Sequence, residues 1–66
     1  MKVLSASEVA KKTSMSVSNI RRLARNKQFP EPFALTESRY GWLEADVDEW
    51  ISECVRRYRR RNHAEN

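Results

Sequence analysis

Apolar side chains recur at helical spacing in three parts of the chain, and capping residues mark where the first two begin. The first part opens on Ser5, with Glu8 three positions later. This is a capping box, in which the serine hydroxyl accepts from the Glu8 amide and the carboxylate reaches back to the Ser5 amide. The pattern predicts a helix from Ser5 to about Thr13, which is too short to be stable unless it packs on a neighbour.

A second helix is predicted from Val17 to about Asn26, with Ser16 as its N-cap, after a tight turn over residues 13–15. On a helical wheel its core-facing residues are Val17, Ile20, Leu23 and Ala24. The opposite face carries Ser18, Arg22, Arg25 and Asn26, with Asn19 and Arg21 at its edges. The core face is therefore narrow and the outer face basic.

The prolines in the segment 29–32 end the helical region, because they enforce an extended backbone. Residues 33–35 and 39–42 are predicted to be short strands, and the polar residues 36–38 between them favour a hairpin turn. A last helix is predicted to begin near Glu44 or Ala45. Its core-facing stripe consists of Val47, Trp50, Ile51, Cys54, Val55 and Tyr58.

The predicted order is helix, tight turn, helix, hairpin, helix. A connection of about three residues between the first two helices is typical of a helix-turn-helix, whose second helix lies in the major groove of DNA. A hairpin after that helix is a wing. We therefore predict a mainly α fold with a small β-hairpin, a winged helix-turn-helix, over residues 1–61, followed by a frayed tail over residues 62–66.

Charge is segregated along the chain. The net charge of +4 divides into +6 over residues 1–30, −6 over residues 31–55 and +4 over residues 56–66. Faces of opposite sign are expected, and the basic ones are candidates for binding a polyanion. Solvated surface charge is the alternative explanation.

The composition argues against catalysis. A chain of 66 residues has little room for a substrate pocket, and it has one cysteine, Cys54, and one histidine, His63. Because Cys54 is the single cysteine, the chain cannot form an internal disulfide, and the position of Cys54 on an apolar stripe predicts a thiol packed in the core. We expect no enzyme activity, cofactor, metal site or small-molecule substrate.

Acidic residues at the start of the last helix are the one set that resembles a metal cluster. They are Asp46, Asp48, Glu49 and Glu53. Their position at a helix N-terminus favours complementation of the helix dipole instead. No apolar run is long enough to span a membrane or to form a secretory signal, which predicts a soluble intracellular protein without a membrane partner.

The second helix carries the candidate DNA-binding residues. Arginine can donate two hydrogen bonds to guanine, and asparagine can pair in the same way with adenine. A helix that enters the groove by its amino end presents Val17, Ser18, Asn19 and Arg22 to base edges. Ser16 and Ser18 can also donate to a phosphate at the helix start. Arg21 and Arg25 suit flanking phosphates, or these polar groups only make an amphipathic helix soluble.

Further candidate contacts lie outside the second helix. Lys27 follows the second helix and is a candidate phosphate contact, and Arg39 on the hairpin suits a wing that reaches the minor groove or a phosphate. Arg39 could equally pair with Glu37. Tyr40 and Trp50, like Trp42, could stack on bases, but their spacing predicts that they belong to the core.

The run of arginines over residues 56–61 is the strongest local charge. It could add phosphate affinity without base preference, end the helix with favourable dipole placement, or contact a partner protein.

Several segments together resemble the AlpA-type prophage regulators, which are small winged helix-turn-helix proteins related to MerR and to phage excisionases. The resemblance covers about residues 3–51 and rests on residues 8–10, 16–23, 29–32, 42–44 and 47–51. It implies a DNA-binding regulator of prophage or mobile-element genes, with Arg22 at the family position for a base or phosphate contact. It also implies a cytoplasmic bacterial protein associated with the nucleoid.

This chain departs from the family at its turns. Ser14, Lys27 and the hairpin residues Glu37 and Ser38 stand where glycine is usual, and Arg21 and Gly41 stand where Tyr and Arg are common. Ser14 and Lys27 are therefore expected to adopt a left-handed backbone, which costs roughly 1 kcal/mol each.

We therefore predict a sequence-specific regulator of double-stranded DNA. One recognition helix reads too few base pairs to select one genomic site, so we expect binding as a homodimer or cooperative oligomer, or alongside an integrase or RNA polymerase. Two alternatives remain: an excisionase-type architectural protein that assists an integrase, and a protein-interaction adaptor without specific DNA binding.

Overall fold

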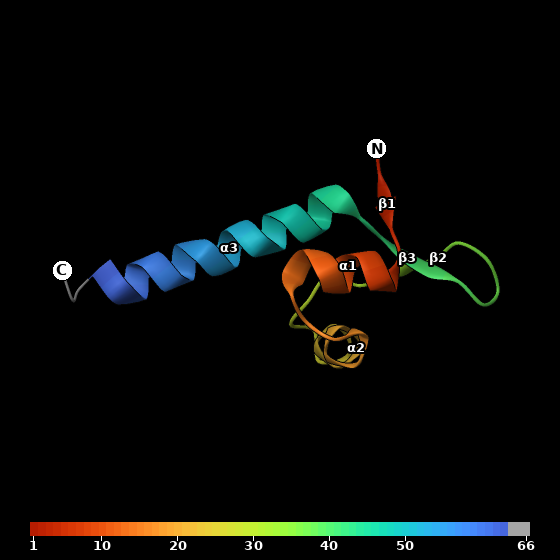
Figure 1. Ribbon diagram of the computed structural model, residues 1–66, viewed down its shortest axis with the longest axis horizontal. Coiled ribbons are helices and arrows are strands. Elements are labelled where there is room, and N and C mark those ends of the chain that lie inside the picture. The colour runs from red at the N-terminus through yellow and green to blue at the C-terminus, as the bar shows by residue number, and fades with distance from the viewer. Residues whose placement is uncertain (64–66) are drawn as a thin grey trace.

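The computed structural model describes residues 1–63, with side chains through Arg61, and shows three helices and a small antiparallel sheet within that range (Figure 1). The elements are β1 (Val3–Leu4), α1 (Ala6–Thr13), α2 (Val17–Arg25), β2 (Phe33–Ala34), β3 (Tyr40–Leu43) and α3 (Glu44–His63). The predicted winged helix-turn-helix class is confirmed, since α1 and α2 are followed by the β2–β3 hairpin and then by α3.

α1 and α2 begin and end where the local signals place them. Ser5 Oγ accepts from the Glu8 N–H at 3.2 Å, and Glu8 Oε1 accepts from the Ser5 N–H at 2.8 Å, which completes the capping box. Ser14 closes α1 with a φ of 60°, and Lys27 follows α2 with a φ of 63°. Both left-handed residues are those expected from the missing glycines.

The sheet has one strand more than the predicted hairpin. β3 is central, with β2 on one side and β1 on the other, both antiparallel to it. Leu4 of β1 lies opposite Trp42, and Phe33 of β2 lies opposite Gly41. Two residues carry too little periodicity to predict β1, and its pairing places Leu4 in the core.

The core lies between α1, α2, the sheet and the start of α3. Its buried side chains are Leu4, Val9, Ile20, Ala24, Phe29, Trp42 and Val47. The Trp42 indole N–H donates to the Pro30 carbonyl and that of Trp50 to the Gln28 carbonyl, both at 2.8 Å. The Phe29 ring meets both indoles edge-on, with centroid distances of 6.3 Å and 4.7 Å. These contacts fix the segment after α2 against α3 and confirm Trp42 as a core residue.

α3 packs on the rest of the chain through its first half. Val47 is fully buried there. Lys12 of α1 forms ion pairs with Glu44 at 3.5 Å and with Asp48 at 2.9 Å. Figure 1 shows the second half of α3 extending beyond the other elements, in a molecule that measures 49 × 24 × 19 Å.

The predicted core-facing stripe of α3 is wrong at its far end. Val55 is 40% exposed and Tyr58 66% exposed. Only the end of α1 and the turn after it approach this part of the helix, where they line a pocket with Val55 and Tyr58 without covering them. Cys54, expected as a packed thiol, is only half-buried. Of the expected tail, Asn62 and His63 continue the helix, and residues 64–66 lie outside the described residues.

α3 is also the longest helix among residues 1–63, with 20 residues. Its charged residues are distributed over both halves. Within the described part of the chain, no helix combines enough length with enough apolar character to cross a membrane.

Candidate nucleic-acid interface

α2 exposes its predicted polar face. Ile20 and Ala24 are buried against α1 and the sheet, whereas Val17 is half-buried at the helix start. The solvent-exposed side chains are Ser18, Asn19, Arg21, Arg22 and Arg25. Figure 1 shows α2 and α3 on opposite sides of α1, and the groove between α2 and the acidic half of α3 is lined on the α2 side by Leu23 and by none of these exposed residues.

The arginines of α2 carry uncompensated charge. Within residues 1–61, no ion pair involves Arg21, Arg22 or Arg25. No acidic residue occurs between Glu8 and Glu31 along the chain. A polyanion approaching α2 therefore meets three guanidinium groups without displacing a competing carboxylate.

Two of the candidate base-reading residues contact each other. Arg22 Nη2 donates to Asn19 Oδ1 at 3.0 Å on the exposed face of the helix. The bond orients the guanidinium toward the amino end of α2, which is the end that enters the groove in a helix-turn-helix. The amide nitrogen of Asn19 and the remaining guanidinium donors are left for other acceptors.

The start of α2 combines a cap with a free hydroxyl proton. Ser16 Oγ accepts from the Asn19 backbone N–H at 3.2 Å. A serine hydroxyl that accepts in this way still has its own proton to donate. Ser16 and the exposed Ser18 can therefore both donate to an anion at this helix end.

The structure brings the wing next to α2. A groove between them is lined by Ala6, Arg21, Arg25, Pro32, Ser38, Tyr40 and Trp42. Arg21 and Arg25 supply positive charge from one wall, and Ser38 and Tyr40 supply hydroxyl groups from the other. An anion in this groove would meet donors from two separate elements.

Tyr40 was predicted to belong to the core, and this is wrong. It is 57% exposed, although it shares a sheet face with the buried Trp42. The helices cover the sheet only at the Trp42 end, and Tyr40 lies at the hairpin end. Sequence reasoning missed Tyr40 and Ser38 as groove residues; the signal available was the position of Tyr40 directly beside the polar turn.

Lys27 is placed differently from the arginines. Its ammonium group lies 2.8 Å from Glu31 Oε1, four residues on. The hydrogen bond and charge of Glu31 raise the pKa of Lys27, and the lysine in turn lowers the pKa of Glu31. Its positive charge is thus locally compensated, and binding a phosphate through Lys27 requires this exposed pair to open.

The wing closes without the glycines usual in the related family. Thr36 Oγ1 accepts from the backbone N–H groups of Ser38 and Arg39, at 3.3 Å and 3.1 Å. Leu35 N–H donates to the Arg39 carbonyl at 2.8 Å. Among the residues described, Arg39 forms no ion pair with Glu37, and its side chain is exposed on the wing.

Three acidic residues of α3 have partners, whereas Asp46 and Glu49 form no ion pair among residues 1–61. Glu44 and Asp48 hold Lys12, and Glu53 pairs with Arg56 at 3.1 Å. Within the part of the chain that the structure describes, no three histidine, cysteine or acidic side chains come together as a metal-binding group.

Comparison with known proteins identifies one family. The model of the family described as prophage CP4-57 regulatory protein (AlpA) matches residues 2–55. The match covers α1, α2, the sheet and the first half of α3, and it stops where α3 leaves the body of the molecule. No curated protein and no solved structure matches the chain.

Proposed function

Because this chain belongs to the AlpA family of prophage regulatory proteins, we propose that it controls prophage or mobile-element genes by binding specific double-stranded DNA with α2 in the major groove. The observation that carries this proposal is the exposed face of α2, where three arginines without an acidic partner flank Asn19. The regulatory role rests on the family match, whereas the DNA-reading surface is inferred from the charges and exposure of this chain's own residues.

The residues divide into two roles. Asn19 and Arg22 are bonded to each other on the exposed face of α2 and are assigned to base edges, with Val17 and Ser18 at the start of the helix. The phosphate-contacting group consists of Ser16, Arg21, Arg25, Lys27 and Arg39, to which the groove adds Ser38 and Tyr40. Contacts to phosphates position the protein, whereas contacts to base edges select the sequence.

More than one copy is needed on a specific site. A single recognition helix reads a few base pairs, which is too little to distinguish one operator among the sites of a genome. We infer binding to repeated or inverted half-sites, with an integrase or RNA polymerase as further partners on DNA. A spacing of one helical turn between half-sites would place two copies on the same face of the duplex.

Selection of bound duplexes from a random pool tests the DNA-reading role directly. A consensus with a defined half-site supports it and also gives the spacing and symmetry. Equal, weak binding to selected and random duplexes would instead indicate an adaptor that binds proteins.

Substitution separates the two roles on the selected half-site. Arg22→Ala should cost about 1–3 kcal/mol on the preferred duplex and reduce discrimination between bases, because a bidentate contact to a base edge is lost. Arg21→Ala is the matched control, since Arg21 is its exposed neighbour on the same helix and carries the same charge. It should weaken binding to all duplexes alike, as expected for a phosphate contact.

Fluorescence anisotropy with preferred and single-base-changed duplexes measures both effects. The assignment fails when the two variants change affinity and discrimination in the same proportion. Far-UV circular dichroism of each variant shows that α2 is still folded.

A further inference from the structure

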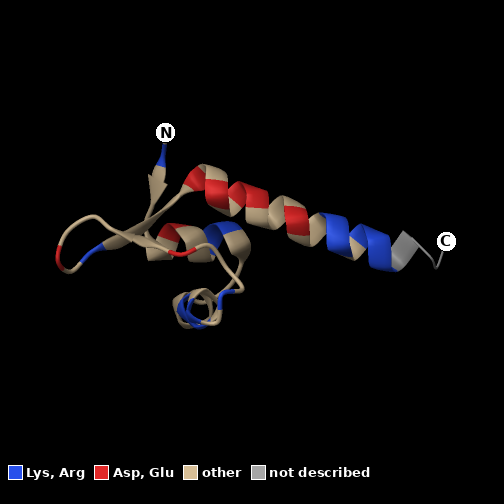
Figure 2. Ribbon diagram, turned by 180° about the vertical axis from the view of Figure 1, so that it is seen from behind, with Lys and Arg blue, Asp and Glu red and all other residues tan. Residues whose placement is uncertain are grey.

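α3 carries a stripe of charged side chains that the DNA-binding proposal does not use. Asp46, Glu49, Glu53, Arg57 and Arg60 follow one another at intervals of three or four residues, so they share one face of the helix. All five are exposed. We call this face the charged stripe. Its amino half is acidic and its carboxyl half is basic, as the red and blue segments of α3 show in Figure 2.

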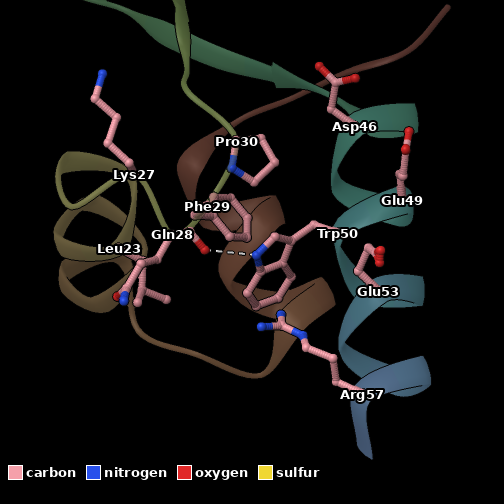
Figure 3. Close-up of a pocket in the computed structure, with 10 residues that line it drawn as sticks. All are labelled: Leu23, Lys27, Gln28, Phe29, Pro30, Asp46, Glu49, Trp50, Glu53 and Arg57. Carbon is pink, nitrogen blue, oxygen red and sulfur yellow. Dashed lines mark hydrogen bonds between the residues drawn. The ribbon is translucent and has the colours of Figure 1, made fainter. Parts of the chain in front are cut away.

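The acidic half of the charged stripe forms one wall of a groove. Figure 3 shows Asp46, Glu49 and Glu53 along α3, and Arg57 one turn further on with its guanidinium group directed toward the Trp50 indole; the segment that follows α2 forms the opposite wall. The groove is also lined by Leu23, Phe29 and Trp50. Its floor is rigid, because the Trp50 indole is bonded to the Gln28 carbonyl at 2.8 Å and the Phe29 ring lies 4.7 Å from Trp50.

A groove with aromatic rings at its base and carboxylates along one wall can bind a guanidinium group. Arginine stacks on aromatic faces and donates in a planar fork to carboxylates, so one side chain can use both walls of such a groove. Lys27 and Arg57 of the same chain also line the groove, but among residues 1–61 neither forms an ion pair with its carboxylates. Glu53 pairs with Arg56 of its own helix at 3.1 Å, so Asp46 and Glu49 are the carboxylates left for an incoming guanidinium group.

The chain itself supplies such a group at the other end of α3. The second half of α3 extends beyond the body, and its arginines are exposed there. When two such helices lie antiparallel, the basic half of each meets the acidic half of the other. The contact is the same in both directions, as a two-fold symmetric dimer requires.

We propose that two copies of this chain associate through antiparallel α3 helices, with the arginines of each charged stripe in the acidic, aromatic-floored groove of the other. The spacing agrees with this arrangement. When Glu53 faces Arg57 of the second copy, Glu49 lies opposite Arg60 of the second copy, because Glu49 precedes Glu53 by four residues and Arg60 follows Arg57 by three. Each pair then occurs twice by symmetry.

The contacts are exposed, so the association is sensitive to salt. Single exposed ion pairs contribute little and are screened by electrolyte, and the aromatic floor adds the burial that they lack. The dimer forms without DNA, so measurements off DNA test it independently of the proposed function: a monomeric protein that still reads DNA would refute only this inference.

Charge exchange in the full chain provides the test, by sedimentation velocity at low salt without DNA. Wild type should dimerise, and high salt should dissociate it. Glu53→Arg alone and Arg57→Glu alone should each weaken self-association roughly tenfold or more, which is at least ~1.4 kcal/mol. An equimolar mixture should restore the dimer, since every 53–57 contact in the heterodimer joins opposite charges.

Arg59→Glu is the control for Arg57→Glu, because it changes the net charge by the same amount but at a residue that lies off the charged stripe. It should leave self-association unchanged. A monomeric wild type, a mixture that stays monomeric, or an equal loss in the control would overturn the proposal. Circular dichroism of each variant separates a lost contact from a lost fold.

Cross-linking tests the antiparallel order. Cys54 is the one cysteine of the chain and lies near the midpoint of α3, so the two copies of this residue lie close to the two-fold axis. A short bis-maleimide should link wild type into a covalent dimer, after a mono-maleimide has shown that the thiol reacts. A dimer with reactive thiols that does not cross-link would refute the antiparallel arrangement.

Discussion

Ser14 and Lys27 stand at the ends of α1 and α2 with positive φ, a conformation that favours glycine. Backbone hydrogen bonds maintain both turns. Met15 N–H donates to the Ala10 carbonyl at 3.0 Å, and Gln28 N–H donates to the Leu23 carbonyl at 2.8 Å. These bonds satisfy carbonyls at the helix ends, and they outweigh the roughly 1 kcal/mol cost of a side chain in the left-handed region.

Ser14→Gly should therefore stabilise the protein by about 0.5–1 kcal/mol, because glycine adopts a positive φ without strain. Part of this gain is lost, because glycine increases the conformational entropy of the unfolded chain. Urea unfolding measures the change. Ser7→Gly, at an exposed position inside α1, is the control and should destabilise by about 0.5–1 kcal/mol. The explanation is wrong when both substitutions shift stability in the same direction.

At the scale of the element, α1 depends on its capping box. Hydrogen bonds from the Ser5 backbone and hydroxyl lower the pKa of Glu8 below its ordinary value of 4.5. A carboxylate with a lowered pKa in the folded chain stabilises the fold above the ordinary value, and that contribution disappears as the pH falls through the lowered pKa. α1 should thus become less stable on acidification.

Glu8→Gln tests this contribution, since glutamine can also complete a capping box but does not titrate. Between about pH 6 and pH 3, wild type should lose more stability than the variant. The lowered pKa of Glu31 is common to both proteins and cancels in the comparison. Thermal unfolding over a pH series provides the measurement, and equal acid sensitivity of the two proteins would contradict the role of Glu8.

The elements differ in how far their own residues define them. α1 and α2 were predicted to within one residue, because caps, apolar period and stop signals all lie inside each segment. The start of α3 at Glu44 was predicted in the same way. The length of the core-facing stripe on α3 was overestimated, because a periodic pattern reports which side chains share a face and not whether another element covers that face.

At the scale of the whole molecule, the fold separates charges that are close in sequence. α2 and the acidic half of α3 lie on opposite sides of α1, and the basic half of α3 points away from the body (Figure 2). The acidic stretch of the chain therefore does not neutralise the face of α2. A duplex bound at α2 meets a basic surface in a molecule whose net charge is only +4.

DNA affinity should fall steeply with salt, with a slope of about −0.9 for each phosphate neutralised. A chain ending at Arg56 lacks the exposed arginines of the far end of α3, and on a single half-site its slope should be shallower by about 0.9 for each arginine that contacts a phosphate. Its discrimination between bases should be unchanged. Titration of a labelled duplex at several salt concentrations measures this, and an unchanged slope would show that the far end of α3 makes no phosphate contact.

The two left-handed turns were expected from the glycines usual in the related family. The amino-acid sequence by itself determined the boundaries of α1 and α2, the start of α3 and the division of α2 into a core face and a basic face. Each of these depends on neighbours within about one helical turn, so a short stretch of residues contains the whole signal. The tertiary structure alone decided that Val3–Leu4 joins the sheet and that Tyr40 is exposed beside Arg21 and Arg25. It also decided that the second half of α3 extends beyond the hydrophobic core. Those outcomes depend on which distant segments pack together and where the covering layer ends, and no local pattern of residues records either.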